Sequence, residues 1–180
     1  MDVKKILEGE KFDFLNEDEK RFIDAFSDEL AKLGYANDGI QDYVVFGKYK
    51  IEYYKAEVKT KKVIARIYIR DGDEKIAARW GGHGLGIVLR LYFTNIDKHR
   101  AYIECAPDFI KMPFTDSHSV CRGCKGKCNR RKLYTIDDKS YAKCTDSAFM
   151  FNEPNKHDVL EYVNLLTTFY PVKTGISGGG

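Results

Sequence analysis

Residues 17–33 (EDEKRFIDAFSDELAKL) carry apolar side chains at helical spacing, with charged side chains on the opposite side. Asn16 precedes the pattern as a favourable N-cap, with Glu19 three residues later, and Gly34 follows it as a favourable stop. The apolar positions are Phe22, Ile23, Phe26, Leu30 and Leu33. We expect an amphipathic helix here that packs on another element.

From about residue 44 the apolar pattern changes to a period of two, which is typical of strands. Four segments predict strands: KYKIEYYKAEV, KKVIARIYIRDG, EKIAARW and GIVLRLYFTN. In the second, Val63, Ala65, Ile67 and Ile69 alternate with Ile64, Arg66, Tyr68 and Arg70, as in a sheet with one covered face. Asp71-Gly72-Asp73 predicts a hairpin turn after it, and such short connections require antiparallel pairing.

The rest of the chain predicts helices and a small hairpin. IDKHRAYIECA is helical in pattern up to Pro107, and DFIKM predicts a further turn. KLYTIDDKSYAKC alternates around Asp137-Asp138 as a hairpin does, and AFMFN is typical of a strand. Residues 156–170 carry an apolar helical face that Pro171 ends. The chain is therefore expected to be α+β, with a four-stranded antiparallel sheet and flanking helices.

Four of the five cysteines lie in the stretch CRGCKGKCNRRKLYTIDDKSYAKC, at Cys121, Cys124, Cys128 and Cys144. A CxxC turn presents two thiolates to one ion, and the hairpin would return Cys144 towards Cys128. Four thiolates then complete the tetrahedral shell that zinc takes at structural sites. The arrangement resembles a zinc ribbon, except that no second CxxC follows Cys144. We predict a structural Zn²⁺ site made by these four cysteines.

Several alternatives for the cysteines stay open. His118 could replace one cysteine as a ligand, and four thiolates also bind iron–sulfur clusters. Basic neighbours favour reactive thiolates with a redox function. Disulfides fit less well, because five thiols cannot all pair within one chain and a reducing compartment disfavours them. Cys105 lies outside the cluster, and we expect it to be a buried structural thiol.

The charge pattern singles out the same stretch. The chain has a formal charge of +3, but residues 121–144 hold eight Lys and Arg against two acids, whereas the remainder holds 22 basic and 25 acidic residues. Part of this charge would balance the thiolates. The remainder, centred on Arg130, Arg131 and Lys132, is a candidate contact for nucleic acid or an acidic protein partner. We expect a single domain over 1–174, with 117–146 as a zinc-binding insert and 175–180 as a flexible tail.

The sequence contains no signature that identifies a reaction. The glycine-rich run RWGGHGLG lacks the Lys-Ser/Thr of a phosphate-binding P-loop, but Trp80 and His83 within it are candidates to edge a pocket. An enzyme that uses Trp80, His83 and Cys105 is therefore one alternative. Tyrosines on the predicted strands favour packing over a base-stacking platform.

Composition indicates a globular protein, with 43% hydrophobic and 32% charged residues. The N-terminal segment has no apolar signal sequence, and the run GIVLRLYF is too short to span a bilayer, so we expect a cytoplasmic protein without membrane contact. We expect a binding or regulatory domain for a small molecule or a protein. A nucleic-acid-binding zinc module is the first alternative, and the enzyme above is the second.

Overall fold

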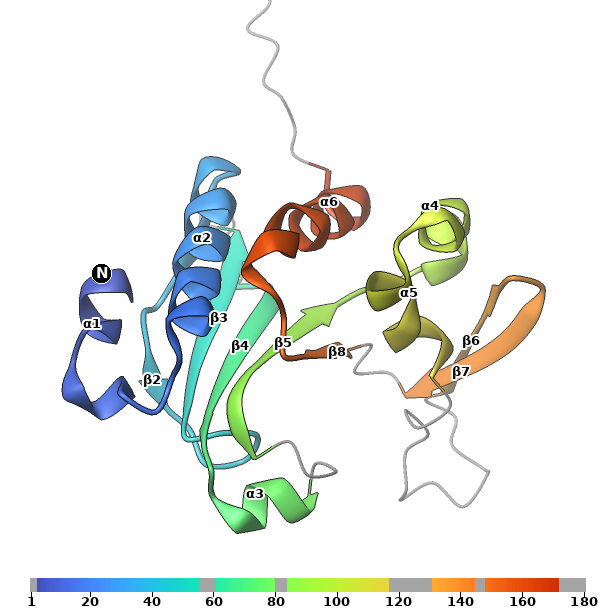
Figure 1. The fold of residues 1–180 in the computed structure, drawn as a ribbon. Coiled ribbons are helices and arrows are strands. Elements are labelled where there is room, and N and C mark those ends of the chain that lie inside the picture. The colour runs from blue at the N-terminus through green and yellow to red at the C-terminus, as the bar shows by residue number, and fades with distance from the viewer. Residues whose placement is uncertain (1–2, 56–60, 80–83, 117–130, 145–147, 172–180) are drawn as a thin grey trace, which may run out of the picture.

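The structure is a computed structural model of the chain that describes residues 3–55, 61–79, 84–116, 131–144 and 148–171. Within these ranges, six α-helices and eight strands form an α+β fold, which confirms the expected class (Figure 1). None of the described helices is both long and apolar enough to cross a membrane. In chain order the elements are α1 (Val3–Leu7), η1 (Glu10–Phe12), α2 (Glu17–Lys32), β1 (Tyr35–Asn37), β2 (Gln41–Asp42), β3 (Tyr49–Lys55), β4 (Val63–Asp71), α3 (Glu74–Arg79), β5 (Leu85–Tyr92), η2 (Ile96–His99), α4 (Arg100–Cys105), α5 (Asp108–Thr115), β6 (Arg131–Ile136), β7 (Lys139–Cys144), β8 (Ala148–Asn152), η4 (Lys156–Asp158) and α6 (Val159–Phe169).

Six strands form one antiparallel sheet in the order β1-β3-β4-β5-β8, with β2 also paired to β3. The prediction of four strands is therefore wrong in number. Strands β1 and β2 contain three and two residues, too few to display a period of two. The predicted strand AFMFN is confirmed as β8, which pairs with β5 although more than fifty residues separate them along the chain.

The segment predicted as a third strand is instead the helix α3. Its start is capped by Asp73, whose carboxylate accepts hydrogen bonds from the backbone N–H groups of Lys75 and Ile76. Strands β4 and β5 nevertheless pair directly, from Asp71 opposite Leu85 onward. The connection between them is thus a short helical excursion and not an additional strand.

The helices α2 and α6 lie on one face of the sheet (Figure 1). Strand side chains that point towards them are buried, for example Tyr53, whose ring packs edge-on against Phe26 of α2 at 5.3 Å. Phe151 of β8 contacts Tyr162 of α6 in the same way at 5.2 Å. Helix α2 begins with the predicted capping box, in which Asn16 and Glu19 exchange side-chain and backbone hydrogen bonds. This helix-covered face forms the main core.

Glu19 also ties α2 to the sheet. One of its carboxylate oxygens accepts a hydrogen bond from the backbone N–H of Ile87 in β5, at 3.2 Å. The carboxylate occupies the space where a side chain of Gly86 would lie, and Gly86 has a positive φ of 87°. The positive φ favours glycine here, and a Cβ would push the carboxylate of Glu19 away from Ile87. The contact fixes where α2 sits along β5.

The predicted hairpin is confirmed as β6 and β7, with Asp137 and Asp138 forming its two-residue turn. Both have positive φ, as a type I′ turn demands. Arg100 of α4 pairs with Asp138 at 2.7 Å, and Lys111 of α5 pairs with Asp137 at 2.6 Å. Tyr134 donates a buried hydrogen bond of 2.6 Å to a backbone carbonyl of α5. The hairpin is therefore held against α4 and α5 at its tip and along β6 (Figure 1).

Candidate functional site

Most of the site residues predicted from the sequence lie outside the described residues. These are the predicted ligands Cys121, Cys124 and Cys128, the alternative ligand His118, the pocket residues Trp80 and His83, and the basic residue Arg130. Within the described ranges, no group of three or more His, Cys, Asp or Glu side chains is arranged to hold a metal ion. The zinc site therefore remains a prediction.

The backbone of the hairpin bears on that prediction. Cys144, the last residue of β7, lies directly opposite Arg131, the first residue of β6. Cys128 precedes Arg131 by only three residues, so the hairpin returns Cys144 to the part of the chain that follows Cys128. Lys132, one of the proposed contact residues, is exposed on β6 opposite Lys143.

Cys105 is exposed, so the prediction of a buried thiol is wrong. Helix α4 contains only six residues and buries Ile103, while Ala101 and Cys105 lie on its outer side. Burial is expected from the sequence because Ala101, Tyr102 and Cys105 share a helical face, but α4 buries the side that carries Ile103 instead.

The best-defined polar surface is the face of β3, β4 and β5 opposite α2 and α6, which we call the far face. Its members follow from the register, since strand residues alternate between the two faces. They are Lys50, Glu52 and Tyr54 of β3, Arg66, Tyr68 and Arg70 of β4, and Val88, Arg90 and Tyr92 of β5. The alternation in KKVIARIYIRDG predicts a sheet with one covered face. Arg66, Tyr68 and Arg70 do share the far face, but Tyr68 and Arg70 are buried, so the second face is also covered in part.

Part of the far face is covered by the loop between β2 and β3. Tyr43 and Phe46 of this loop stack on Tyr68 with ring centroids 5.5 and 5.1 Å away. Arg70 donates a hydrogen bond of 2.8 Å to the carbonyl of Phe46, and both Tyr68 and Arg70 are fully buried. Gly47 passes so close to the backbone of Ile69 that a Cβ there would lie 2.7 Å from its carbonyl oxygen. The loop therefore packs closely against β4.

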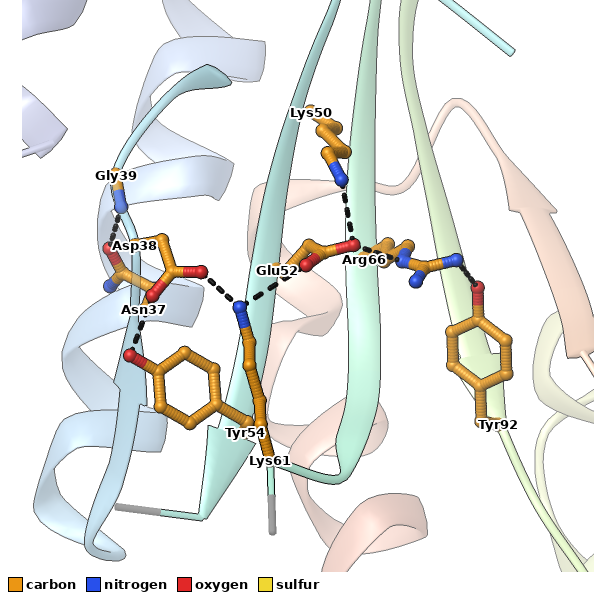
Figure 2. A network of polar contacts seen from close by, with 9 residues as sticks. All are labelled: Asn37, Asp38, Gly39, Lys50, Glu52, Tyr54, Lys61, Arg66 and Tyr92. Carbon is orange, nitrogen blue, oxygen red and sulfur yellow. Dashed lines mark hydrogen bonds and ion pairs between the residues drawn. The ribbon is translucent and has the colours of Figure 1, made fainter. Parts of the chain in front are cut away.

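Glu52 is the centre of an ion network on the far face (Figure 2). Its carboxylate accepts hydrogen bonds from Lys50 at 2.9 Å, Arg66 at 2.8 Å and Lys61 at 3.3 Å, and Lys61 also pairs with Asp38. Burial alone would raise the pKa of Glu52, but the bond from Lys50 and the charge of Arg66 outweigh it and hold the pKa below its ordinary value. Glu52 therefore stays ionised and neutralises one of its three cations.

Arg66 has a second arginine as its neighbour across the sheet. The register places Glu52 opposite Arg66, Arg66 opposite Arg90, and Arg90 opposite Met150 of β8. Like charges directly opposite each other on neighbouring strands destabilise a sheet. Arg66 is compensated by Glu52, whereas Met150 offers Arg90 no charge.

Aromatic rings and not carboxylates hold Arg90. Its guanidinium carbon lies 4.7 Å from the ring centroid of Phe46 and 5.3 Å from that of Tyr92. Its Nη1 makes one long contact of 3.5 Å with the hydroxyl of Tyr68, and its buried Nε has no hydrogen-bond partner among the residues that the structure describes. No carboxylate in the described ranges forms an ion pair with Arg90. With Nε buried and Nη1 on Tyr68, the Nη2 edge of this stacked guanidinium is left to donate to an anion in its plane.

The positive charge of Arg90 also affects a lysine of the hairpin. Lys143 of β7 lies with its amino group 3.5 Å from the ring centroid of Phe149. Burial, and then the positive charge of Arg90, lower the pKa of Lys143 to about 7. Arg90 therefore adds to the effect of burial and disfavours protonation of Lys143.

Sequence reasoning did not identify Arg66 and Arg90 as a pair. The signal present was the isolated arginine in each of two apolar runs, VIARIYI and GIVLRLYF. We found no matching protein-family model, no matching curated protein and no matching solved structure for the chain.

Proposed function

We propose that this protein is a binding domain for a small anionic molecule, which occupies the far face around Arg66 and Arg90. The observation that carries the proposal is the cross-strand pair of arginines, of which only Arg66 has a carboxylate partner. Together, Glu52, Arg66 and Arg90 of one cross-strand row and Lys50, which bonds to Glu52, carry a formal charge of +2. A bound anion would supply the negative charge that these four residues lack and would relieve the repulsion between the two guanidinium groups.

The proposal is tested by calorimetric titration with inorganic phosphate at low ionic strength, against a chloride background of equal ionic strength. We expect saturable binding that weakens at least about 10-fold in Arg90→Gln, since charge-assisted hydrogen bonds contribute about 1.5–3 kcal/mol. Arg21→Gln is the matched control, because Arg21 is exposed on α2, the helix on the other face of the sheet. No binding by the wild type, or an equal loss in both variants, would exclude the far face as an anion site.

We also propose that Cys121, Cys124, Cys128 and Cys144 hold a structural zinc ion at the base of the hairpin. The register of β6 and β7 supports this, because it returns Cys144 to the chain that follows Cys128. When bound, zinc would cross-link a segment too short to bury a core of its own. Elemental analysis of the purified protein tests the proposal: one equivalent of zinc supports it, and iron with visible absorbance would replace it with an iron–sulfur cluster.

A further inference from the structure

The chemical class of the anion follows from the charges and donors around Arg90. We propose that the far face recognises a phosphate monoester, in its doubly charged form, on a small molecule. This inference rests on the proposed anion site and narrows it. Three features of the far face carry it: the size of the excess charge, the kind of hydrogen-bond donors and the use of the aromatic rings.

The excess charge matches a dianion. Lys50, Arg66 and Arg90 carry three positive charges, and Glu52 is the single carboxylate among them. The nearby pair of Lys61 and Asp38 is neutral as a unit. A carboxylate or a phosphodiester has one negative charge and would leave one positive charge uncompensated. A phosphate monoester above about pH 7 carries nearly two, because its second pKa is about 6.

The donors match a tetrahedral oxyanion. Two guanidinium groups stand on adjacent strands. Arg66 already donates through Nε to Glu52 and through Nη1 to Tyr92, so the Nη2 groups of Arg66 and Arg90 are the donors left for the oxygens of one tetrahedral group. The hydroxyl of Tyr92 contacts Arg66 at 2.6 Å and so lies beside these donors, whereas Tyr68, which contacts Arg90, is fully buried. Burial is the main cause that raises the pKa of Tyr92, so its phenol remains protonated as a donor.

The aromatic rings are already used by cations. Tyr92 has the guanidinium carbons of both Arg66 and Arg90 within 5.3 Å of its ring centroid, and Phe46 has that of Arg90 at 4.7 Å. Tyr43 has the amino group of Lys50 over its ring at 5.1 Å. Rings engaged in this way do not offer the free faces that a base-stacking platform for single-stranded nucleic acid needs. The site is therefore built for the phosphate group and not for a run of bases.

The experiment compares three probes at pH 8: methyl phosphate, dimethyl phosphate and acetate. We expect methyl phosphate to bind at least about 10-fold more tightly than the two monoanions. Its second negative charge interacts at close range with the two excess positive charges of the far face. Affinity should fall at least about 10-fold in Arg90→Gln and less in Arg90→Lys, which retains a charge but loses the planar fork. Each variant is first checked for folding by circular dichroism and urea unfolding.

The variant Glu52→Gln distinguishes anion binding from a purely structural role of the far-face charges, because it changes the affinity for methyl phosphate in a direction that loss of stability would not. Removal of the negative charge should tighten the binding of methyl phosphate by about 5-fold, even though the variant is less stable. Glu29→Gln on α2 is the control and should leave affinity unchanged. Equal affinity for all three probes would overturn the monoester assignment and leave the general anion site intact. Failure of all three to bind would overturn both. Preferential binding of an oligonucleotide with internal phosphodiesters would replace the small molecule by nucleic acid.

Discussion

Replacement of Glu52 by glutamine removes the one negative charge at the centre of the far-face network. The side chain keeps its size, so packing is preserved, and the amide oxygen still accepts a hydrogen bond. The carboxylate is nearly buried, with 9% of its side-chain surface exposed, and its partners Lys50 and Arg66 are 19% and 27% exposed. The variant therefore leaves partly buried cations without their counter-charge, which is the costly way to break an ion pair.

The magnitude follows from the individual contacts. A hydrogen bond to a charged group contributes about 1.5–3 kcal/mol, against about 0.5–1.5 kcal/mol for a neutral one, so each close contact loses about 1 kcal/mol. Lys50 and Arg66 make close contacts with Glu52 at 2.9 and 2.8 Å. Lys61 is longer at 3.3 Å and 40% exposed, so solvent screens it and it adds little. We expect Glu52→Gln to lower the free energy of unfolding by about 2 kcal/mol.

Urea unfolding at pH 7, with the slope m compared between variants, measures this loss. Glu29→Gln breaks an exposed ion pair with Lys32 on α2 and should cost less than about 0.5 kcal/mol. Because the pKa of Glu52 lies below its ordinary value of 4.5, its contribution is complete above that pH. It is lost as the pH falls through the lower native pKa, so wild type and variant should converge in acid. A loss no larger than that of Glu29→Gln, or no convergence in acid, would refute the reasoning.

Two further predictions concern the hairpin and the contact between α2 and the sheet. Cys124→Ser should release the metal and loosen residues 117–146 while the sheet stays folded, which metal analysis and amide hydrogen exchange would show; a full equivalent of metal in the variant would mean that Cys124 is not a required ligand. Gly86→Ala should destabilise the protein by more than about 1 kcal/mol in thermal unfolding, since the new Cβ meets the carboxylate of Glu19 at a residue with positive φ. Gly34→Ala is its matched control: Gly34 also has a positive φ, but no atom lies within 4 Å of the added Cβ, so only the backbone cost should appear. Equal losses in the two variants would show that the contact with Glu19 does not matter.

Local patterns predicted the elements whose signals are complete within a few residues. Helix α2 shows its apolar period, its cap at Asn16 and its stop at Gly34, and all three are confirmed. The turn at Asp137-Asp138 was also visible. The prediction of a strand at 74–80 was wrong because the apolar residues there fit a strand as well as a helix. The signal that decides for a helix is the cap supplied by Asp73.

The far-face site could not be predicted in the same way. Arg66 and Arg90 lie 24 positions apart, and they are neighbours only because α3 bridges β4 and β5 in one particular register. A shift of one residue would have moved Arg90 to the helix-covered face. The burial of Tyr68 and Arg70 likewise depends on the loop that carries Phe46, whose position no local pattern encodes.

The bond between Glu19 and Ile87 has a consequence for the order of folding. During synthesis α2 emerges long before β5, because 68 residues separate the two partners of this bond. The exchange of hydrogen bonds between Asn16 and Glu19 can form as soon as α2 exists, whereas the second oxygen of Glu19 has no β5 backbone to accept from until the central strands are in place. Helix α2 can therefore form early, but its alignment on the sheet is fixed late. Variants that weaken this bond should speed unfolding more than they slow folding.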